Sequence, residues 1–362
     1  MSEFLPEVLV VEILARLSMK DLSRFRCVCK TWRDLINHRG FAERYREISQ
    51  VRFVSFYHKG LYLLDVVGKN VVIKNPHKLD FPLDEAIIDE STCVLHCHGT
   101  LCVAVKNHTL TVWNPYSKQF KTIPNPGIYR DSNILGFGYD PVSQDYKLVT
   151  FIDELVSSTA HVFEFRTGSW REGVPVPYPD WHYRERVGTF LDQYIYWIAY
   201  RSSVDRFILC FNLSTYEYRK LALPVYNQVV TCSWLGVTSQ KLCVIEYVPW
   251  EKEFWVSVME KTGSWNKIIS LSVSDFIDVL DDKYDYQVEF VSFTKNNDVV
   301  VTFTGYYDGV EREVREREKK KMLLFKTGDS TFEQVRLCNS LVGFRFLTEY
   351  VETPVIIDRI FI

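Results

Sequence analysis

The apolar residues near the start of the chain recur at the spacing of an α-helix. The first stripe follows the pattern i, i+3, i+4 and i+7, and its members are Val10, Ile13, Leu14 and Leu17. Two more stripes follow, made of Leu22, Phe25, Val28 and Cys29 and then of Val28, Trp32, Leu35 and Ile36. Pro6 suits the first turn of a helix, Ser18 and Asp21 have the spacing of a capping box, and Gly40 is suited to end a helix. The pattern therefore predicts three short helices.

These helices carry more apolar surface than so small a unit buries by itself. A segment below roughly 60 residues buries only about 60% of its unfolded surface. An apolar face that is left over on such a unit is usually the docking site of a partner. The alternative is an ordinary helical bundle whose apolar residues all face its own core.

After residue 50 the helical spacing disappears, and short runs rich in Val, Ile, Phe, Tyr and Thr predict strands. One unit recurs, with an apolar strand end, a polar turn and a second short strand. Its copies begin at Leu64, Trp113, Phe163, Phe211, Val258 and Leu324, which are 49, 50, 48, 47 and 66 residues apart. A period near 48 with several short strands per unit predicts the blades of a β-propeller, about six in number.

Composition and charge narrow the classes of function. The 362 residues have a net charge of -3 with both signs mixed along the chain, which argues against a nucleic-acid binder. No run reaches the roughly 18 apolar residues of a membrane span, and Glu3 and Glu7 precede the first apolar run where a secretory signal would have basic residues. We therefore expect nine reduced cysteines, no membrane partner, and a cytoplasmic protein, a nuclear protein or both.

The order of residue types in positions 5–36 resembles an F-box, the motif that binds the Skp adaptor of SCF-type ubiquitin ligases. The string reads L-P-x-x-x-V-x-x-I-L-x-R-L-x-x-x-D-L-x-R-F-R-x-V-C-K-x-W-x-x-L-I without a gap. The resemblance implies an F-box domain over residues 1–48 that binds a Skp-family adaptor and, through it, a cullin. The positions that it implies are shared between the small core and the adaptor surface are Leu5, Pro6, Ile13, Leu14, Leu17, Leu22, Val28, Cys29 and Trp32.

Residues 49–362 resemble the plant F-box-associated domain, which is related to Kelch propellers. The local matches include Gly99-Thr100-Leu101-Cys102 before Trp113-Asn114-Pro115, Leu135 to Asp140 before Asp145 to Val149, Thr167 to Arg171, Gly188-Thr189-Phe190 before Tyr196-Trp197, and Ile208 to Pro224. Phe211-Asn212-Leu213 departs from the usual Phe-Asp-Leu of that family. The resemblance implies a small three-helix F-box followed by an all-β propeller that binds a target protein.

The densest group of possible metal ligands consists of Cys93, His96, Cys97, His98 and Cys102. It lacks the second ligand pair, beyond a longer loop, that zinc sites usually have. On a strand, Cys93 and Cys97 would share one face while His96 points away, so we expect structural core residues and no metal. The sequence also contains no nucleophile elbow, phosphate loop or dinucleotide fingerprint, so we expect neither a cofactor nor an enzyme.

Aromatic loops are the better candidates for target binding. The residues singled out are Tyr178, Trp181, Tyr183 and Arg184 in one loop and Trp250 in another. Trp, Tyr and Arg are the residue types most often found as interface hot spots. The alternative is that these rings cap the core between blades.

These patterns together predict a substrate-recognition subunit of an SCF-type ubiquitin ligase. In this reading the chain holds a target for ubiquitination and proteasomal degradation, and no covalent chemistry takes place on it. Two alternatives remain open among binding proteins, a scaffold outside any ligase and a pollen S-locus receptor for pistil ribonucleases. A third alternative, outside the binding proteins, is an enzyme with a propeller fold. Residues 37–50 contain one glycine and no proline, so we expect them to continue as a helix or to pack on the propeller.

Overall fold

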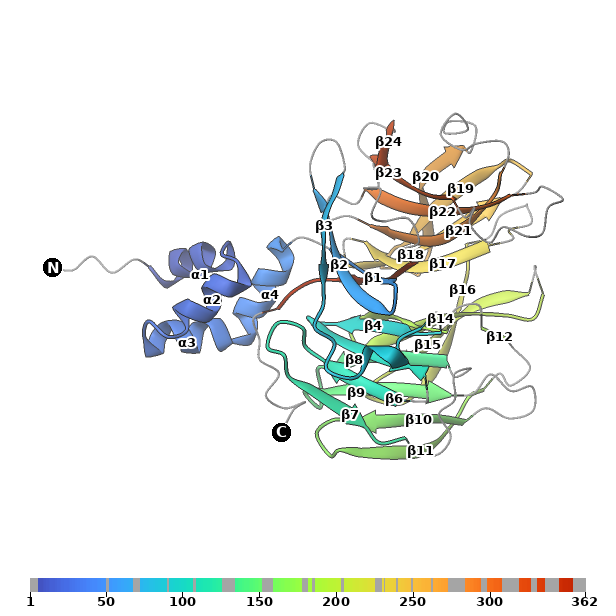
Figure 1. The fold of residues 1–362 in the computed structure, drawn as a ribbon. Coiled ribbons are helices and arrows are strands. Elements are labelled where there is room, and N and C mark those ends of the chain that lie inside the picture. The colour runs from blue at the N-terminus through green and yellow to red at the C-terminus, as the bar shows by residue number, and fades with distance from the viewer. Residues whose placement is uncertain are drawn as a thin grey trace.

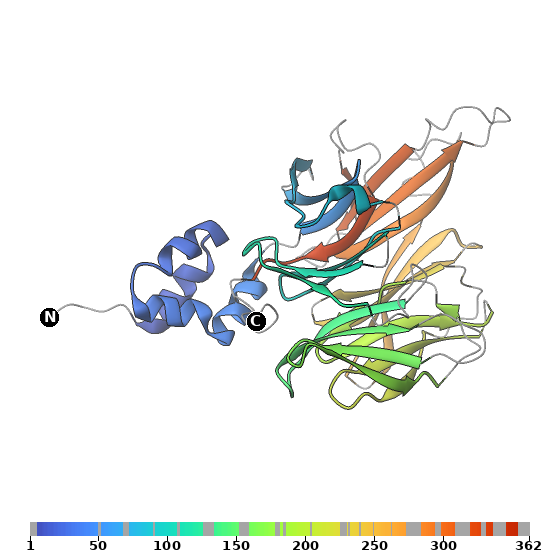
Figure 2. The same ribbon diagram turned by 60° about the horizontal axis from the view of Figure 1, so that its bottom comes forward.

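The protein folds as a small helical unit followed by a β-propeller (Figure 1). The computed structural model describes residues 6–49, 52–67, 72–89, 91–106, 109–125, 134–151, 159–177, 182–183, 186–202, 205–224, 230, 232–238, 240–248, 250–261, 263–272, 284–293, 298–307, 319–326, 331–335 and 345–353. Figures 1 and 2 show the helices on one side of the propeller, with α4 nearest to it.

The helices are α1 (Glu7–Ala15), α2 (Met19–Phe25), α3 (Lys30–Asn37) and α4 (Arg39–Ile48). The first three correspond to the predicted helices. The expectation that Gly40 ends the third helix is wrong, because α3 ends at Asn37 and Gly40 lies in the first turn of α4. The side chain of His38 caps α4 by accepting a hydrogen bond from the backbone N–H of Gly40 at 3.2 Å. The expected helical continuation of residues 37–50 is therefore confirmed for α4.

The described strands form six antiparallel sheets. The first contains β25 (Arg345–Tyr350), β1 (Arg52–Tyr57), β2 (Gly60–Val67) and β3 (Val72–Lys78). The second and third contain β4 (Cys93–Cys97), β5 (Thr100–Val105), β6 (Thr109–Trp113) and β7 (Phe120–Ile123), then β8 (Ile134–Asp140), β9 (Asp145–Phe151), β10 (Thr159–Glu164) and β11 (Ser169–Pro175). A short 3₁₀ turn, η1 (Glu85–Ile87), links the first sheet to the second.

The remaining sheets continue in chain order. In the fourth, β12 (His182–Tyr183) and β13 (Thr189–Leu191) both pair with β14 (Tyr194–Tyr200), followed by β15 (Arg206–Asn212) and β16 (Tyr218–Ala222). The fifth contains β17 (Cys232–Thr238), β18 (Lys241–Val248), β19 (Glu253–Met259) and β20 (Trp265–Ser272). The last contains β21 (Tyr284–Phe293), β22 (Val299–Tyr307), β23 (Lys319–Lys326) and β24 (Thr331–Val335).

The first sheet closes the ring, because its innermost strand comes from the far end of the chain. β25 pairs with β1, and Tyr350 lies opposite Arg52. The hydroxyl of Tyr350 also donates to the carbonyl of Gly99 in the next sheet at 3.3 Å. Gly99 has a positive φ of 74°, and a Cβ there would meet the Thr353 side chain at 2.4 Å, so only glycine fits this closure.

The sequence repeat marks the same turn in successive sheets. The copies that begin at Trp113, Phe163, Phe211 and Val258 all fall at the end of the third strand, where the chain turns into the fourth. In two of these turns an asparagine side chain organises the backbone. Asn114 Oδ1 accepts the N–H of Ser117 at 2.9 Å, and Asn212 Oδ1 accepts that of Thr215 at 3.0 Å. Asn212 stands where the resembling family usually has aspartate, and its side-chain oxygen still organises the turn.

A buried ion pair fixes the third sheet against the fourth. Lys147 Nζ lies 2.8 Å from Asp140 Oδ2 and donates to the carbonyl of Leu213 at 2.6 Å. Burial alone would raise the pKa of Asp140, but hydrogen bonds from Lys147, Ser143 and Ser214 outweigh it and lower that pKa to about 2. Every charge in this pair is thus compensated within the fold.

The two ends of the propeller have different neighbours. Adjacent strands are antiparallel, so the turn between the first two strands of a sheet lies opposite the turn between its second and third strands. The helices lie at the end where β25 finishes and β1 begins, close to Arg52 and Glu352. We call the opposite end, with the β14–β15 and β18–β19 turns, the far face.

Candidate functional site

The apolar residues of α1 point to two sides of the helix. Leu14 is 1% exposed and packs in the core of the helical unit, whereas the neighbouring Ile13 is 53% exposed. Val8 and Leu9, one turn earlier, are 72% and 49% exposed. A helix that is apolar all round buries only the side that faces its own unit, so the other side stays in water.

The core of the helical unit is built from residues other than Val8, Leu9 and Ile13. The buried members are Leu14, Ala15, Met19, Leu22, Ile36, Phe41 and Tyr45. Phe25 and Trp32 are half-buried at its edge, with ring centroids 5.2 Å apart. The exposed side chains of α1 are therefore surplus to this core.

A second exposed apolar residue comes from the turn between α2 and α3. Val28 is 61% exposed, and the adjacent Cys29 is exposed as well. Cys29 is the N-cap of α3, where its Sγ accepts the N–H of Trp32 at 3.4 Å. The cap fixes the backbone of this turn and leaves Val28 on the surface.

The structure separates the predicted adaptor positions into three groups by their exposure. Leu14 and Leu22 are buried core residues, Leu17 and Trp32 are half-buried, and Pro6, Ile13, Val28 and Cys29 are exposed; Leu5 lies outside the described residues. The single apolar stripe predicted for the first helix is wrong for Ile13, which turns away from Leu14. Val8 and Leu9 were missed as candidates, although an apolar residue at nearly every position from 8 to 14 was a signal of two apolar sides.

Polar contacts fix the orientation of α1. Arg44 on α4 donates two hydrogen bonds to the carboxylate of Glu12, from Nε to Oε1 at 2.7 Å and from Nη2 to Oε2 at 3.1 Å. These hydrogen bonds hold the pKa of Glu12 below its ordinary value. Ser18 begins α2 as predicted, because its Oγ accepts the N–H of Asp21 at 3.2 Å. The exposed face therefore sits on a helix whose rotation is fixed.

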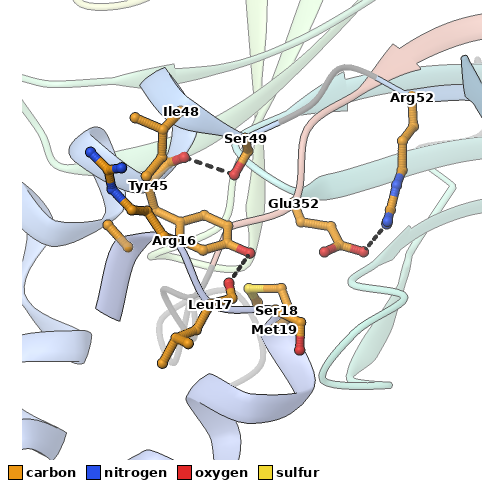
Figure 3. Close-up of a pocket in the computed structure, with 10 residues that line it drawn as sticks. Arg16, Leu17, Ser18, Met19, Tyr45, Ile48, Ser49, Arg52 and Glu352 are labelled. Atoms are coloured by element: carbon orange, nitrogen blue, oxygen red, sulfur yellow. Dashed lines mark hydrogen bonds and ion pairs between the residues drawn. The ribbon is translucent and has the colours of Figure 1, made fainter. Parts of the chain in front are cut away.

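The helical unit also contacts the propeller directly. The hydroxyl of Tyr116, in the β6–β7 turn, donates to the carbonyl of Met19. A cavity of about 620 Å³ lies beside this contact, and Figure 3 shows Tyr45 on one side of it and Glu352 and Arg52 on the other. Burial raises the pKa of Tyr45 to about 12 and also raises that of Glu352. The junction is thus a packed interface with a hollow.

The proposed target-binding residues have different surroundings. Tyr178, Trp181 and Arg184 lie outside the described residues. Tyr183 is buried, with its ring 5.0 Å from that of Phe151, so it caps the core and does not present a surface. Trp250 is 85% exposed in the β18–β19 turn, and for this residue the core alternative is wrong.

The cysteine and histidine cluster is built into the propeller core. Cys93 and Cys97 are buried on one face of β4, as expected, and Cys102 of β5 is buried in the same hydrophobic cluster. His96 points the other way, where its Nε2 accepts the N–H of Gly99 at 2.9 Å. Burial lowers the pKa of His96 to about 4 and raises the pKa of the Cys97 thiol. Each of these four side chains therefore has a packing role.

Comparison with protein families identifies both parts of the chain. A family described as the F-box associated beta propeller domain matches residues 48–357, and the F-box domain matches residues 3–44. The chain therefore belongs to the F-box proteins that carry an F-box-associated β-propeller domain. The predicted family and fold class are confirmed. Within the described residues no helix is long and apolar enough to span a membrane.

Individual relatives agree with this assignment. The chain is 73% identical over 362 residues to "Putative F-box protein At3g16210" of Arabidopsis thaliana, with all of both chains covered. It is 26% identical to "F-box protein At2g17830" of the same plant, over 83% of this chain and 85% of that one. A solved structure of the lectin SapL1 is 11% identical with a TM-score of 0.46, over 81% of this chain and 99% of that one, and this likeness supports no functional argument.

Proposed function

We propose that this protein is the substrate-recognition subunit of an SCF-type ubiquitin ligase. The observation that carries the proposal is the set of exposed apolar residues on the F-box helices, with Val8, Leu9 and Ile13 on α1 and Val28 in the α2–α3 turn. These side chains are surplus to the core of the helical unit, and burying each against a partner is worth about 1.5–3 kcal/mol. A Skp-family adaptor is the partner that the F-box family suggests, and a cullin would be held through it.

The propeller would bind the target protein on the far face. Trp250 is the described candidate, because it is an exposed indole on a short turn between two paired strands. Tyr178, Trp181 and Arg184 remain candidates by sequence. This arrangement would keep the adaptor and the target at opposite ends of the molecule, so that neither would obstruct the other.

The contribution of this chain to the reaction would be proximity. A target held beside a charged ubiquitin carrier reacts as if in the same molecule, and a well-matched tether gives effective concentrations of about a millimolar. Such a gain requires a stiff link between the two binding surfaces. Helix α4, the Glu12–Arg44 ion pair and the contact of Tyr116 with Met19 provide supports for such a link. In this role the chain is not an enzyme, and it acts in the cytoplasm, the nucleus or both.

Reconstitution tests this proposal. Proteins captured by the full chain from plant extract in the presence of a proteasome inhibitor would be supplied to a purified adaptor, cullin, ubiquitin-activating enzyme and ubiquitin carrier. We expect ubiquitin transfer to a captured protein only when this chain is present. Capture of partners with no ubiquitin transfer to any of them would instead favour a scaffold outside a ligase.

A further inference from the structure

One tyrosine of the propeller packs on the core of the helical unit. Tyr116 lies in the β6–β7 turn of the second sheet, and its ring contacts the hydrophobic cluster of the helices. Among the described members of that cluster, it is the one that the propeller contributes. Its hydroxyl donates to the carbonyl of Met19, the first residue of α2. Burial raises the pKa of this hydroxyl, so it keeps its proton and stays a donor.

Hydrogen bonds fix the backbone of the turn that carries Tyr116. Asn114 is 2% exposed, and its Oδ1 accepts the N–H of Tyr116 at 3.0 Å as well as that of Ser117. The N–H of Asn114 donates to the carbonyl of Gln119 at 2.9 Å, which closes the turn. The preceding Trp113 is buried and anchors the end of β6 in the propeller core. Tyr116 therefore projects from a rigid support, which is what a side chain needs to hold another element in place.

The chain itself is the other connection between the two domains. Helix α4 ends at Ile48, and β1 begins at Arg52, which forms an ion pair with Glu352 of the propeller. Met19 and Arg52 both line the cavity of about 620 Å³, which therefore lies between the Tyr116 contact and the chain connection. Two bodies that are joined at one point can rotate about it, whereas a second contact on the other side of a hollow fixes their angle.

We propose that Tyr116 is a positioning residue that sets the angle between the F-box helices and the propeller. Its consequence for the reaction rests on the proposed function, because the angle decides which lysines of a bound target reach the ubiquitin carrier. A tether gains nothing where its geometry keeps the two partners apart. Misplacement of reacting groups by about 1 Å can cost about a hundredfold in rate. Tyr116 contacts the helices and not the reacting groups, so it acts through orientation.

A distance measurement on the intact chain tests this orientation without any ligase component. Spin labels attached to ketone-bearing residues, which spare the native cysteines, would replace the exposed Asp34 of α3 and the exposed Val142 of the β8–β9 turn. Electron–electron resonance should give a narrow distance distribution in the otherwise native chain and a shifted or broader one in Tyr116→Ala. An unchanged distribution in Tyr116→Ala would overturn the proposal.

The matched control is Tyr216→Ala. Tyr216 lies in the corresponding β15–β16 turn of the fourth sheet, and its hydroxyl donates to Glu164 at 2.6 Å within the propeller. This variant loses a tyrosine from the same kind of turn without losing a contact between the domains, so its distances should match the native ones. Equal changes in both variants would overturn the proposal. If Tyr116→Ala does not fold, Tyr116→Phe and Tyr216→Phe make the same comparison by removing only the hydroxyls, and equal distributions in these two would overturn it.

The reconstituted ligase adds a readout that a merely structural role would not move. Tyr116→Ala should keep the dissociation constants for the adaptor and for the captured target. The rate of ubiquitin transfer at saturating target should nevertheless fall by about tenfold, with a changed set of modified lysines. An unchanged rate on an unchanged set of lysines would contradict the role of Tyr116 in the reaction. Absence of transfer with the native chain would instead reject the proposed function, and the distance measurement would still decide whether Tyr116 sets the angle.

Discussion

The helical unit and the propeller treat their apolar side chains in opposite ways. In the propeller, large rings such as Trp113, Trp197 and Phe207 are almost completely buried between packed sheets. In the helical unit, α1 buries Leu14 and leaves Val8 and Ile13 in solvent. The difference follows from geometry. A ring of sheets gives each sheet a neighbour on both faces, whereas four short helices cover only one side of one another.

The comparison shows which part of the molecule leaves large apolar side chains exposed. In the described part of the propeller, the buried charges of Lys147 and Asp140 compensate each other. The helical unit has its own buried core, but several of its large apolar side chains remain exposed. A partner that covers α1 would therefore change the exposed area of the helices and leave the propeller unaltered.

The largest effect should come from breaking the buried ion pair of the propeller. Lys147→Met leaves Asp140 charged and buried, so the free energy of unfolding should fall by about 3–5 kcal/mol in chemical denaturation. The matched control is Lys118→Met, whose ion pair with Asp80 at 3.0 Å is exposed on both sides and should be worth less than about 1 kcal/mol. Equal losses in the two variants would mean that the propeller core does not depend on this pair.

Two adjacent residues of the helical unit test the same contrast between a buried and an exposed side chain. Leu14→Ala should destabilise the unit by about 2–5 kcal/mol, because it opens a cavity in the small core. Ile13→Ala should change the stability by no more than about 0.5 kcal/mol, because Ile13 is exposed. Hydrogen exchange of α1 to α4 measures both. Similar losses for the two variants would mean that Ile13 belongs to the core.

The closure of the ring should be sensitive to acid through His96. Its folded pKa of about 4 lies below the ordinary value of 6.5, because burial disfavours the charged ring. The neutral form is favoured by folding, so this stability is present above pH 6.5 and is lost as the pH falls towards 4, on the order of 1–3 kcal/mol. Denaturation midpoints between pH 7 and pH 4 should show this slope, and His96→Gln should reduce it. An identical slope in the variant would assign the acid sensitivity to other groups.

The smallest effect on stability is expected at the far face. Trp250→Ala should change the free energy of unfolding by no more than about 0.5 kcal/mol, because the side chain is exposed. Capture of a target by the propeller should nevertheless fall by tenfold or more if this indole is an anchor. Tyr183→Phe is the control, since Tyr183 is a buried residue whose substitution should leave target capture unchanged. Equal capture by wild type and Trp250→Ala would remove Trp250 from the binding surface.

Much of this architecture was predictable from local patterns. The helices followed from apolar spacing, and the repeated turns followed from Asn and Gly between strand-like runs. The start of α2 followed from Ser18 and Asp21, because a cap depends only on residues three positions apart.

What was not predictable depends on distant parts of the chain. The sequence assigned Ile13 and Leu14 to the same stripe, and only the packing of α4 against α1 separates them. The exposure of Trp250 and the burial of Tyr183 likewise depend on neighbouring sheets, which composition does not reveal. The cavity between the domains involves Glu352 and Tyr45, which are far apart in the sequence.

The central claim is that the exposed apolar residues of the F-box helices, Val8, Leu9, Ile13 and Val28, form a docking surface for a Skp-family adaptor. The most direct measurement is the dissociation constant of the purified full chain with that adaptor. It is compared between the wild type and the double substitution Ile13→Asp and Val28→Asp. The control is Val142→Asp, which places the same charge at an exposed valine in the β8–β9 turn of the propeller. We predict that the double substitution weakens binding about 100-fold or more, about 2.7 kcal/mol, while Val142→Asp binds as wild type does. A dissociation constant that is the same for the double substitution and the wild type would contradict the account.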